Sequence, residues 1–273
     1  MTTKTNNKIK PFLRWAGGKS WLVKHLNQLM PKVNFKNYHE PFLGGGSIFI
    51  SIQPSKKVFL SDLNKDLIST FATLQVNPEG IIKVLKTYRN TEDFYYKIRN
   101  RKPKGPVTHA ARFIYLNQTS FNGIYRVNLK GEYNVPYGYR TKNFREPDNL
   151  RLVSNRLKGA ILFHGDFALV KDNIKKGDLV FLDPPYTVSH NNNGFIKYND
   201  KLFSLDDQKR LSELIDFVKK KDAYYVLTNA ATKTIEDIFE KSDRKLELNR
   251  ASLIGGLNAE RGQTTEYVFT NVS

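Results

Sequence analysis

Leu179-Val-Phe-Leu-Asp-Pro-Pro-Tyr186 is the stretch of this 273-residue chain from which both the fold and the chemistry can be inferred. Its apolar half has the length and composition of a buried strand. The two consecutive prolines prevent further ladder hydrogen bonds and stiffen the carboxyl end of that strand. In an open α/β sheet, ligands bind at this end of the strands. The stretch therefore predicts a strand that ends in a ligand-binding or catalytic site. From these residues alone, a strand followed by a proline-rich turn without such a role is the alternative.

The residues that follow the predicted strand suit the task of holding a planar base with an amino group. Amino hydrogens can be donated to the Asp183 carboxylate and to the Pro184 carbonyl, whose position Pro185 fixes. The ring of Tyr186 can stack on the base. Asp183, Pro184, Pro185 and Tyr186 are therefore the candidate catalytic residues.

The composition favours a nucleic-acid partner. The chain has 44 Lys and Arg against 26 Asp and Glu, a formal net charge of +18, which is in the range of phosphate-binding proteins. A basic but inert surface is the alternative. The chain has no cysteine, which excludes disulfides, thiol nucleophiles and cysteine-ligated zinc, including the zinc deaminases that act on bases.

No segment of the sequence has the pattern of a signal peptide or a membrane span. Residues 1–10 are polar and basic without an apolar stretch, and no later run approaches membrane-spanning length. We therefore expect a soluble, cytoplasmic protein.

Strand-like runs alternate with helix-like segments at both ends of the chain. The expected strands lie at residues 57–62, 161–166, 224–229 and 266–271, besides the opening stretch, and Leu205–Lys219 is expected to be an amphipathic crossover helix. Between about residues 68 and 152 a basic, aromatic-rich region with helical periodicity replaces this pattern. The sequence predicts an α/β domain of residues 1–67 and 153–273 with a mostly helical insertion of residues 68–152.

Asn122-Gly123 is a tight-turn signal inside the predicted insertion. The side chains around it can stack on bases or donate bidentate hydrogen bonds. The segment therefore predicts a β-hairpin that reads DNA, and an exposed hairpin without a partner is the alternative.

Two glycine-rich segments can be compared with nucleotide-binding motifs. Leu13-Arg-Trp-Ala-Gly-Gly-Lys-Ser20 ends like a P-loop, but Leu13 stands where that pattern requires glycine, which disfavours a P-loop ATPase. Phe42-Leu-Gly-Gly-Gly-Ser-Ile-Phe-Ile50 has the first half of a dinucleotide fingerprint, with Phe49 at the third glycine position. Asp62 ends the next predicted strand, where a carboxylate can accept hydrogen bonds from ribose hydroxyls. This pattern favours a nucleoside-bearing cofactor without a pyrophosphate.

Taken in order, these segments resemble the motifs of Dam-type DNA adenine-N6 methyltransferases of the alpha group. The resemblance runs from about Pro11 to the end of the chain. It implies a Rossmann-like S-adenosylmethionine-dependent methyltransferase sheet, interrupted by a DNA target-recognition domain at residues 68–152. The matching segments are Arg14-Trp-Ala-Gly-Gly-Lys19, Glu40-Pro-Phe-Leu-Gly-Gly-Gly46, Asp62, Asn122-Gly-Ile-Tyr-Arg126, Asn134-Val-Pro-Tyr-Gly138 and Asp183-Pro-Pro-Tyr186.

The resemblance implies S-adenosyl-L-methionine as the cofactor, with no metal. Asp166 matches the acidic residue that contacts the adenine of the cofactor in this family. Asp62 matches the acidic residue that binds the ribose hydroxyls. Gly44 to Gly46 would let the protein backbone approach the methionine end of the cofactor. The implied cofactor-binding residues are Trp15, Ala16, Gly17, Lys19, Pro41, Phe42, Gly44, Gly45, Gly46, Ser47, Asp62, Asp166, Phe167 and Asp183.

The resemblance also implies double-stranded DNA as substrate and direct attack by a flipped adenine, because the amino nitrogen is paired inside the duplex. Phe121 matches an inserting aromatic, and Ile124 and Arg126 match base-reading positions. The implied target is GATC or a GAT-containing site. Residues 121–125 and 137–140 depart from the motifs of the family, so the exact recognition sequence stays open. The implied DNA-binding residues are Phe121, Asn122, Ile124, Arg126, Asn134, Pro136, Tyr137 and Arg140.

Other classes stay open from the sequence. A cytosine-N4 DNA methyltransferase would use the same attack, although serine more often replaces Asp183 in such enzymes. A non-catalytic, sequence-specific DNA-binding protein would not need Asp62 and the cofactor motifs, and the central segment disfavours RNA or protein methylation. We expect a monomer, and a cognate restriction endonuclease is a further partner to consider.

Overall fold

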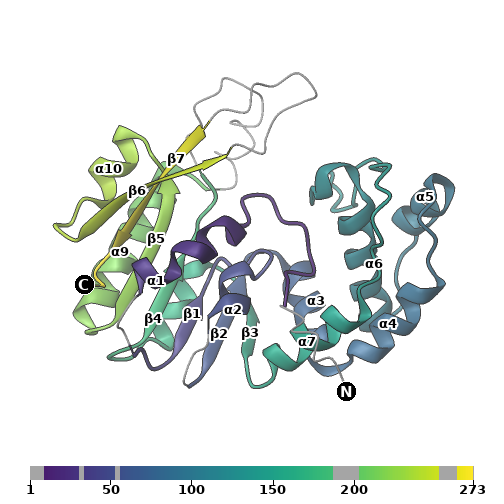
Figure 1. The fold of residues 1–273 in the computed structure, drawn as a ribbon, viewed down its shortest axis with the longest axis horizontal. Helices are drawn as coiled ribbons and strands as arrows, with labels where there is room; N and C mark the ends of the chain where they lie inside the picture. The colour runs from purple at the N-terminus through teal and green to yellow at the C-terminus, as the bar shows by residue number, and fades with distance from the viewer. Residues whose placement is uncertain (1–8, 31–33, 53–55, 187–202, 252–262, 273) are drawn as a thin grey trace, which may run out of the picture. The chain divides into compact units, whose positions relative to one another are not determined.

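The computed structural model describes residues 9–30, 34–52, 56–186, 203–251 and 263–272 (Figure 1). The chain divides into two compact units. The first unit comprises Met1–Val23, Leu43–Gln53 and Ser61–Gly165, and the second comprises Lys24–Phe42, Pro54–Leu60 and Asp166–Ser273. Within the described ranges, every helix is too short or too polar to cross a membrane.

The strands form a mixed sheet in the order β3-β2-β1-β4-β5-β7-β6, which can be followed by the labels in Figure 1. β1 pairs in parallel with β2 and β4, and β4 with β5, whereas β7 is antiparallel to β5 and β6. The α/β class is confirmed, and all the strands expected from the sequence are present. The strand bounds are β1 Tyr38–Glu40, β2 Val58–Asp62, β3 Ile161–His164, β4 Leu179–Leu182, β5 Tyr224–Ala230, β6 Arg244–Ala251 and β7 Gln263–Thr270.

In the second unit, β4 is buried along its whole length, as its apolar sequence predicts. The expected crossover helix is α9 (Leu205–Lys220), which begins with a capping box between Ser204 and Asp207. The apolar face of α9 joins one hydrophobic core with the 3-10 helix η3 (Phe167–Asp172), strands β4 and β5, and helix α10 (Lys233–Phe239). This core fixes the carboxyl end of β4, where the candidate catalytic residues begin.

In the first unit, α6 contacts helices α3, α4 and α5. Proline starts α4, α6 and α7, where its missing N–H costs no helical hydrogen bond. The predicted mostly helical character of residues 68–152 is confirmed, and their role as a separate target-recognition domain stays a prediction. The remaining helix bounds are η1 Lys19–His25, α1 Leu26–Leu29, α2 Ser47–Ser51, α3 Lys65–Val76, α4 Pro78–Thr87, α5 Glu92–Asn100, α6 Pro106–Thr119, η2 Phe121–Gly123 and α7 Pro147–Leu157.

The predicted hairpin is irregular and is held by isolated antiparallel bridges, Ser120 with Tyr137 and Val127 with Tyr133. Asn122-Gly123 does form a turn, since both residues have positive φ (51° and 66°). The chain reverses farther on, however, where the Gly131 amide donates to the Asn128 carbonyl. The turn signal therefore marks a bend in the first arm of the hairpin.

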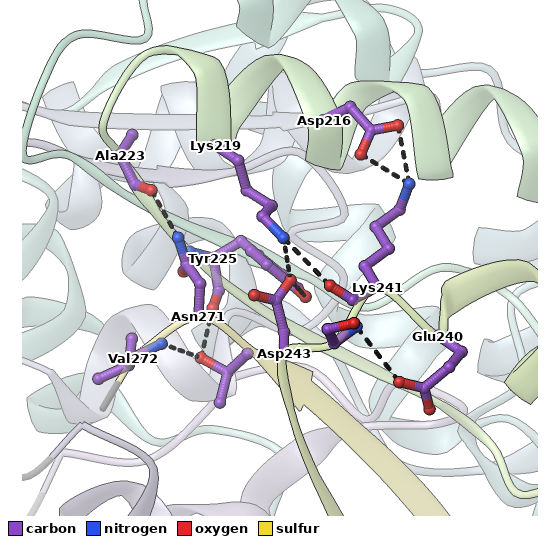
Figure 2. Close-up of polar contacts among 11 residues, drawn as sticks. Asp216, Lys219, Ala223, Tyr225, Glu240, Lys241, Asp243, Asn271 and Val272 are labelled. Atoms are coloured by element: carbon purple, nitrogen blue, oxygen red, sulfur yellow. Dashed lines mark hydrogen bonds and ion pairs between the residues drawn. The ribbon is translucent and has the colours of Figure 1, made fainter.

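A polar network in the second unit joins α9, β5 and the segment before β6 (Figure 2). The hydroxyl of the fully buried Tyr225 donates to Asp243 Oδ2 (2.9 Å), and Lys219 Nζ lies 2.6 Å from the same oxygen. Lys241, whose side chain is only 16% exposed, pairs with the exposed carboxylate of Asp216. Burial and the neighbouring Asp243 raise the pKa of Tyr225, so its hydroxyl stays a donor.

Asp243→Ala is expected to destabilise the fold by about 1–3 kcal/mol, because it leaves the buried Tyr225 hydroxyl without its acceptor. The matched control is Asp216→Ala, whose side chain is 60% exposed and whose ion pair is worth about 0–1 kcal/mol. Urea unfolding followed by fluorescence gives both values. Equal destabilisation of the two variants would contradict the burial argument.

Candidate functional site

The glycine turn and the first predicted acid meet in the first unit. Gly44 and Gly46 have φ of +48° and +68°, a conformation that favours glycine. The Gly44 amide donates to Asp62 Oδ2 (3.0 Å), and the Asn64 amide donates to Oδ1 (2.9 Å). Burial raises the pKa of the Asp62 carboxyl, and the two amide hydrogen bonds offset part of this shift. The carboxylate at the end of β2 is therefore fixed against the turn.

The aromatic ring of Trp15 lies against this turn. A Cβ atom on Gly44 would lie 2.8 Å from Trp15 Cδ1, so the indole can approach this closely only because residue 44 is glycine. A Cβ atom on Gly45 would lie 3.2 Å from Trp15 Cβ, which is a tight contact. Lys19 is buried, and its Nζ donates to the Gly17 carbonyl (3.1 Å). The hydroxyl of Ser20 lies 3.3 Å from that of Ser47, and Ala16 is exposed. The two predicted glycine segments thus lie together.

In the second unit, both polar candidates of the catalytic segment contact buried side chains. Thr228 on β5 is fully buried, and its hydroxyl donates to Asp183 Oδ1 (2.8 Å). Tyr186 donates a short hydrogen bond to Glu266 on β7, which is 1% exposed. The intervening Pro184 is buried and Pro185 is exposed. No local sequence pattern points to Thr228 or Glu266.

Asp166 and Phe167 lie beside Phe42 in the same unit. Asp166 caps η3 by accepting from the Ala168 amide, and its Oδ1 also lies 2.7 Å from an Arg210 nitrogen. The Arg210 guanidinium lies over the Phe167 ring at 4.9 Å. Phe167 stacks on Phe42 with ring centroids 5.4 Å apart, and the preceding Pro41 is buried. Arg210 is a further residue to which no sequence pattern points.

The DNA-reading candidates of the first unit differ in exposure. Phe121, Asn122, Arg126 and Pro136 are exposed, and Ile124 is partly exposed.

Four of these candidates, Arg126, Asn134, Tyr137 and Arg140, make side-chain hydrogen bonds. Arg126 Nε donates to Asn134 Oδ1 (2.8 Å), which orients the guanidinium. Tyr137 is buried, with its hydroxyl 3.0 Å from Asn90 Oδ1 and its ring centroid 5.4 Å from that of Tyr95, so its side chain packs against α5 and the residues before it. An Arg140 nitrogen donates to the Gln118 side chain (3.1 Å).

Comparisons with known proteins identify the family of the chain. Residues 15–252 match the family described as D12 class N6 adenine-specific DNA methyltransferase. The type II methyltransferase M1.LlaDCHI of Lactococcus lactis subsp. cremoris is 32% identical over 96% of this chain and 95% of its own length. The type II methyltransferase M.MjaIII of Methanocaldococcus jannaschii is 35% identical over 81% and 84% of the two chains. A DNA adenine methylase of Haemophilus influenzae is 34% identical over 85% and 83%. The chain belongs to the D12 class of N6 adenine-specific DNA methyltransferases.

Proposed function

We propose that this adenine-specific DNA methyltransferase takes its methyl group from S-adenosyl-L-methionine and transfers it to a flipped adenine in double-stranded DNA, at GATC or a GAT-containing site. Family membership gives the reaction class. The observation that carries the mechanism is the Asp183 carboxylate, which follows β4 and is held by the buried Thr228 hydroxyl.

The residues of the first unit fit a nucleoside-bearing methyl donor. Asp62 accepts one amide hydrogen bond on each oxygen, and a carboxylate has further lone pairs for two ribose hydroxyls. Gly44 to Gly46 lack side chains, which suits close approach of a ligand to the backbone. In the second unit, Asp166 would accept from the amino group of the donor's adenine. When bound, S-adenosyl-L-methionine supplies an electrophilic methyl group on a sulfonium.

Asp183 and the Pro184 carbonyl would accept the two amino hydrogens of the target adenine. This orients the nitrogen lone pair toward the methyl group and offsets the positive charge that develops during attack. Thr228 keeps the Asp183 carboxylate in one orientation. Glu266 fixes Tyr186, on whose ring the flipped base would stack.

The partner of the chain is DNA, and we propose that it acts on DNA as a monomer in the cytoplasm. Two of the similar proteins are named type II methyltransferases. By likeness to them, a cognate restriction endonuclease would be the second partner in the cell.

Titration calorimetry with S-adenosyl-L-methionine, with and without duplex DNA, tests the donor. We expect binding to one site per chain. Failure to bind in either condition would contradict the proposed donor. Methylation-aware sequencing of DNA treated with the enzyme then gives the recognition site, and a site without GAT would contradict the proposed target.

Arg126→Ala is expected to cost about 1–3 kcal/mol in binding to the cognate duplex and to relax specificity at one base pair. Arginine reads the two major-groove acceptors of guanine, and Asn134 holds Arg126 for this contact. The matched control is Lys130→Ala, which removes one positive charge from the same hairpin and should weaken binding to all sequences alike. Fluorescence anisotropy with cognate and scrambled duplexes measures both. Equal losses on the two duplexes for Arg126→Ala would exclude base reading by this side chain.

A further inference from the structure

Tyr125 connects the base-reading segment, residues 121–126, with the glycine turn of the first unit. Its ring stacks on Trp15, with centroids 5.9 Å apart and an interplanar angle of 26°, and both rings contact Phe113. Trp15 in turn lies against Gly44, where no Cβ would fit. An unbroken series of contacts therefore runs from the reading segment to the turn that Asp62 holds.

The hydroxyl of Tyr125 is fixed at the start of α3. It donates to Asp66 Oδ2 (2.9 Å), while His109 Nε2 lies 3.1 Å from the other oxygen of the same carboxylate. Burial raises the pKa of Tyr125, so the hydroxyl remains a donor at neutral pH. The hydrogen bond from His109 lowers the pKa of Asp66, which stays an acceptor. Tyr125 is thus held at both ends, by Trp15 and by Asp66.

Asn117 on α6 makes a second connection between the same two segments. It is 1% exposed, and its Oδ1 accepts from the Arg14 amide (2.7 Å). Its Nδ2 donates to the Arg14 carbonyl (2.6 Å) and to the Gly123 carbonyl (3.0 Å). One buried amide therefore binds the residue before Trp15 and the turn inside the reading segment.

The close approach of these two backbones leaves little room for independent movement. A Cβ on Gly123 would lie 2.5 Å from Arg14 Cβ. Movement of the reading segment on DNA must therefore displace Arg14 and Trp15, or else break the contacts of Asn117 and Tyr125. Close-packed contacts of this kind have few alternative arrangements.

We propose that Tyr125 and Asn117 are positioning residues that couple recognition of the DNA sequence to binding of the methyl donor. The proposal rests on the function proposed above, which assigns the two segments their ligands. Seating of residues 121–126 on the cognate bases sets the position of Trp15 beside Gly44, so cognate DNA changes the affinity for the donor. Thermodynamic linkage requires the donor to change the affinity for cognate DNA by the same factor.

The test uses S-adenosyl-L-homocysteine as a non-reacting probe and the duplex site found by methylation sequencing. Calorimetry gives the dissociation constant of the probe for the full chain, alone and saturated with cognate duplex. We expect the two constants of the wild type to differ by about 5–150-fold. Tyr125→Leu, which loses the ring, should bring this ratio close to one. Tyr125→Phe keeps the stack on Trp15 and should retain most of the ratio.

Tyr139→Ala is the matched control, since it removes an exposed tyrosine of the same unit. Among the described residues, the hydroxyl of Tyr139 donates a hydrogen bond to Glu92 only. It should keep the wild-type ratio. A second readout uses the fluorescence of Trp15 in a Trp21→Phe background, because the chain has two tryptophans. Cognate duplex should change the Trp15 emission, and Tyr125→Leu should abolish this change even if it lowers stability.

The outcomes separate the coupling from the function on which it rests. A wild type that binds neither probe nor cognate duplex would overturn the proposed function together with the coupling. A wild type that methylates adenine but shows a ratio of one would overturn the coupling alone. The coupling is also overturned, and the function left intact, if Tyr125→Leu keeps both the wild-type ratio and the fluorescence response.

Discussion

Asp183→Ala is expected to abolish measurable adenine methylation, a loss of at least about 10³-fold in kcat, while DNA binding is largely retained. The variant keeps only the Pro184 carbonyl to accept an amino hydrogen, and nothing offsets the charge that develops on the attacking nitrogen. In the wild type, the buried Thr228 hydroxyl donates a hydrogen bond to the Asp183 carboxylate. Single-turnover methylation and duplex binding measured on the same preparation give both numbers.

Asp206→Ala is the matched control for this variant. Asp206 lies in the first turn of α9, also in the second unit, and its side chain is 86% exposed. Its removal changes the net charge by the same amount and should leave turnover unchanged. Near-normal turnover of Asp183→Ala would defeat the assignment of the catalytic carboxylate.

Tyr186→Ala is expected to lower kcat by roughly 10–100-fold, since stacking of a base on an aromatic ring is worth about 1–3 kcal/mol. Tyr186→Phe keeps the ring and should be far milder. The structure adds a specific cost to the phenylalanine variant, because the buried Glu266 then loses the hydroxyl that donates to it. Rapid-quench kinetics with a duplex that carries one target adenine measures both variants.

Glu266→Gln separates stacking from the hydrogen bond that orients the ring. Tyr186→Phe and Glu266→Gln both perturb this bond and keep the ring, so their losses in kcat should be similar and smaller than that of Tyr186→Ala. A loss in Tyr186→Phe as large as that in Tyr186→Ala would show that the hydroxyl, and not the stacking surface, is the essential part of Tyr186.

The main strands and the long crossover helix could be predicted because their signals are local. Residues 179–182 are all apolar and become the fully buried β4. The predicted helix of residues 205–219 is present, and Ser204 and Asp207 form a capping box at its start. Glycines 44 and 46 indicated a turn, and both have positive φ.

Two strands were not predicted because their residues do not follow the usual patterns of burial. The polar side chains of β1 are buried because His39 lies 2.9 Å from Asp178 and Tyr38 donates to Glu40. Strand β6 carries several charged residues and pairs only with β7 among the described strands, and edge strands tolerate charge. Strand β1 has no hydrophobic period in the sequence, and in β6 only Leu246 and Leu248 alternate with polar residues, a pattern too short to predict a strand.

The residues that orient the candidate site depend on contacts far apart in the chain. Thr228 reaches Asp183 because β4 and β5 pair with Leu182 opposite Leu227. Glu266 is placed by the antiparallel pairing of β7 with β5, in which it lies opposite Ala230. Strand register depends on tertiary packing, so local sequence patterns could not identify these partners.

The proposed reaction is transfer of a methyl group from S-adenosyl-L-methionine to the N6 atom of adenine. The most direct measurement is to incubate the purified protein with unmethylated genomic DNA and methyl-labelled S-adenosyl-L-methionine, digest the DNA to nucleosides, and identify the product by mass spectrometry. We expect labelled N6-methyladenine with the wild type and none with Asp183→Ala. N4-methylcytosine, or no labelled nucleoside despite DNA binding, would contradict it.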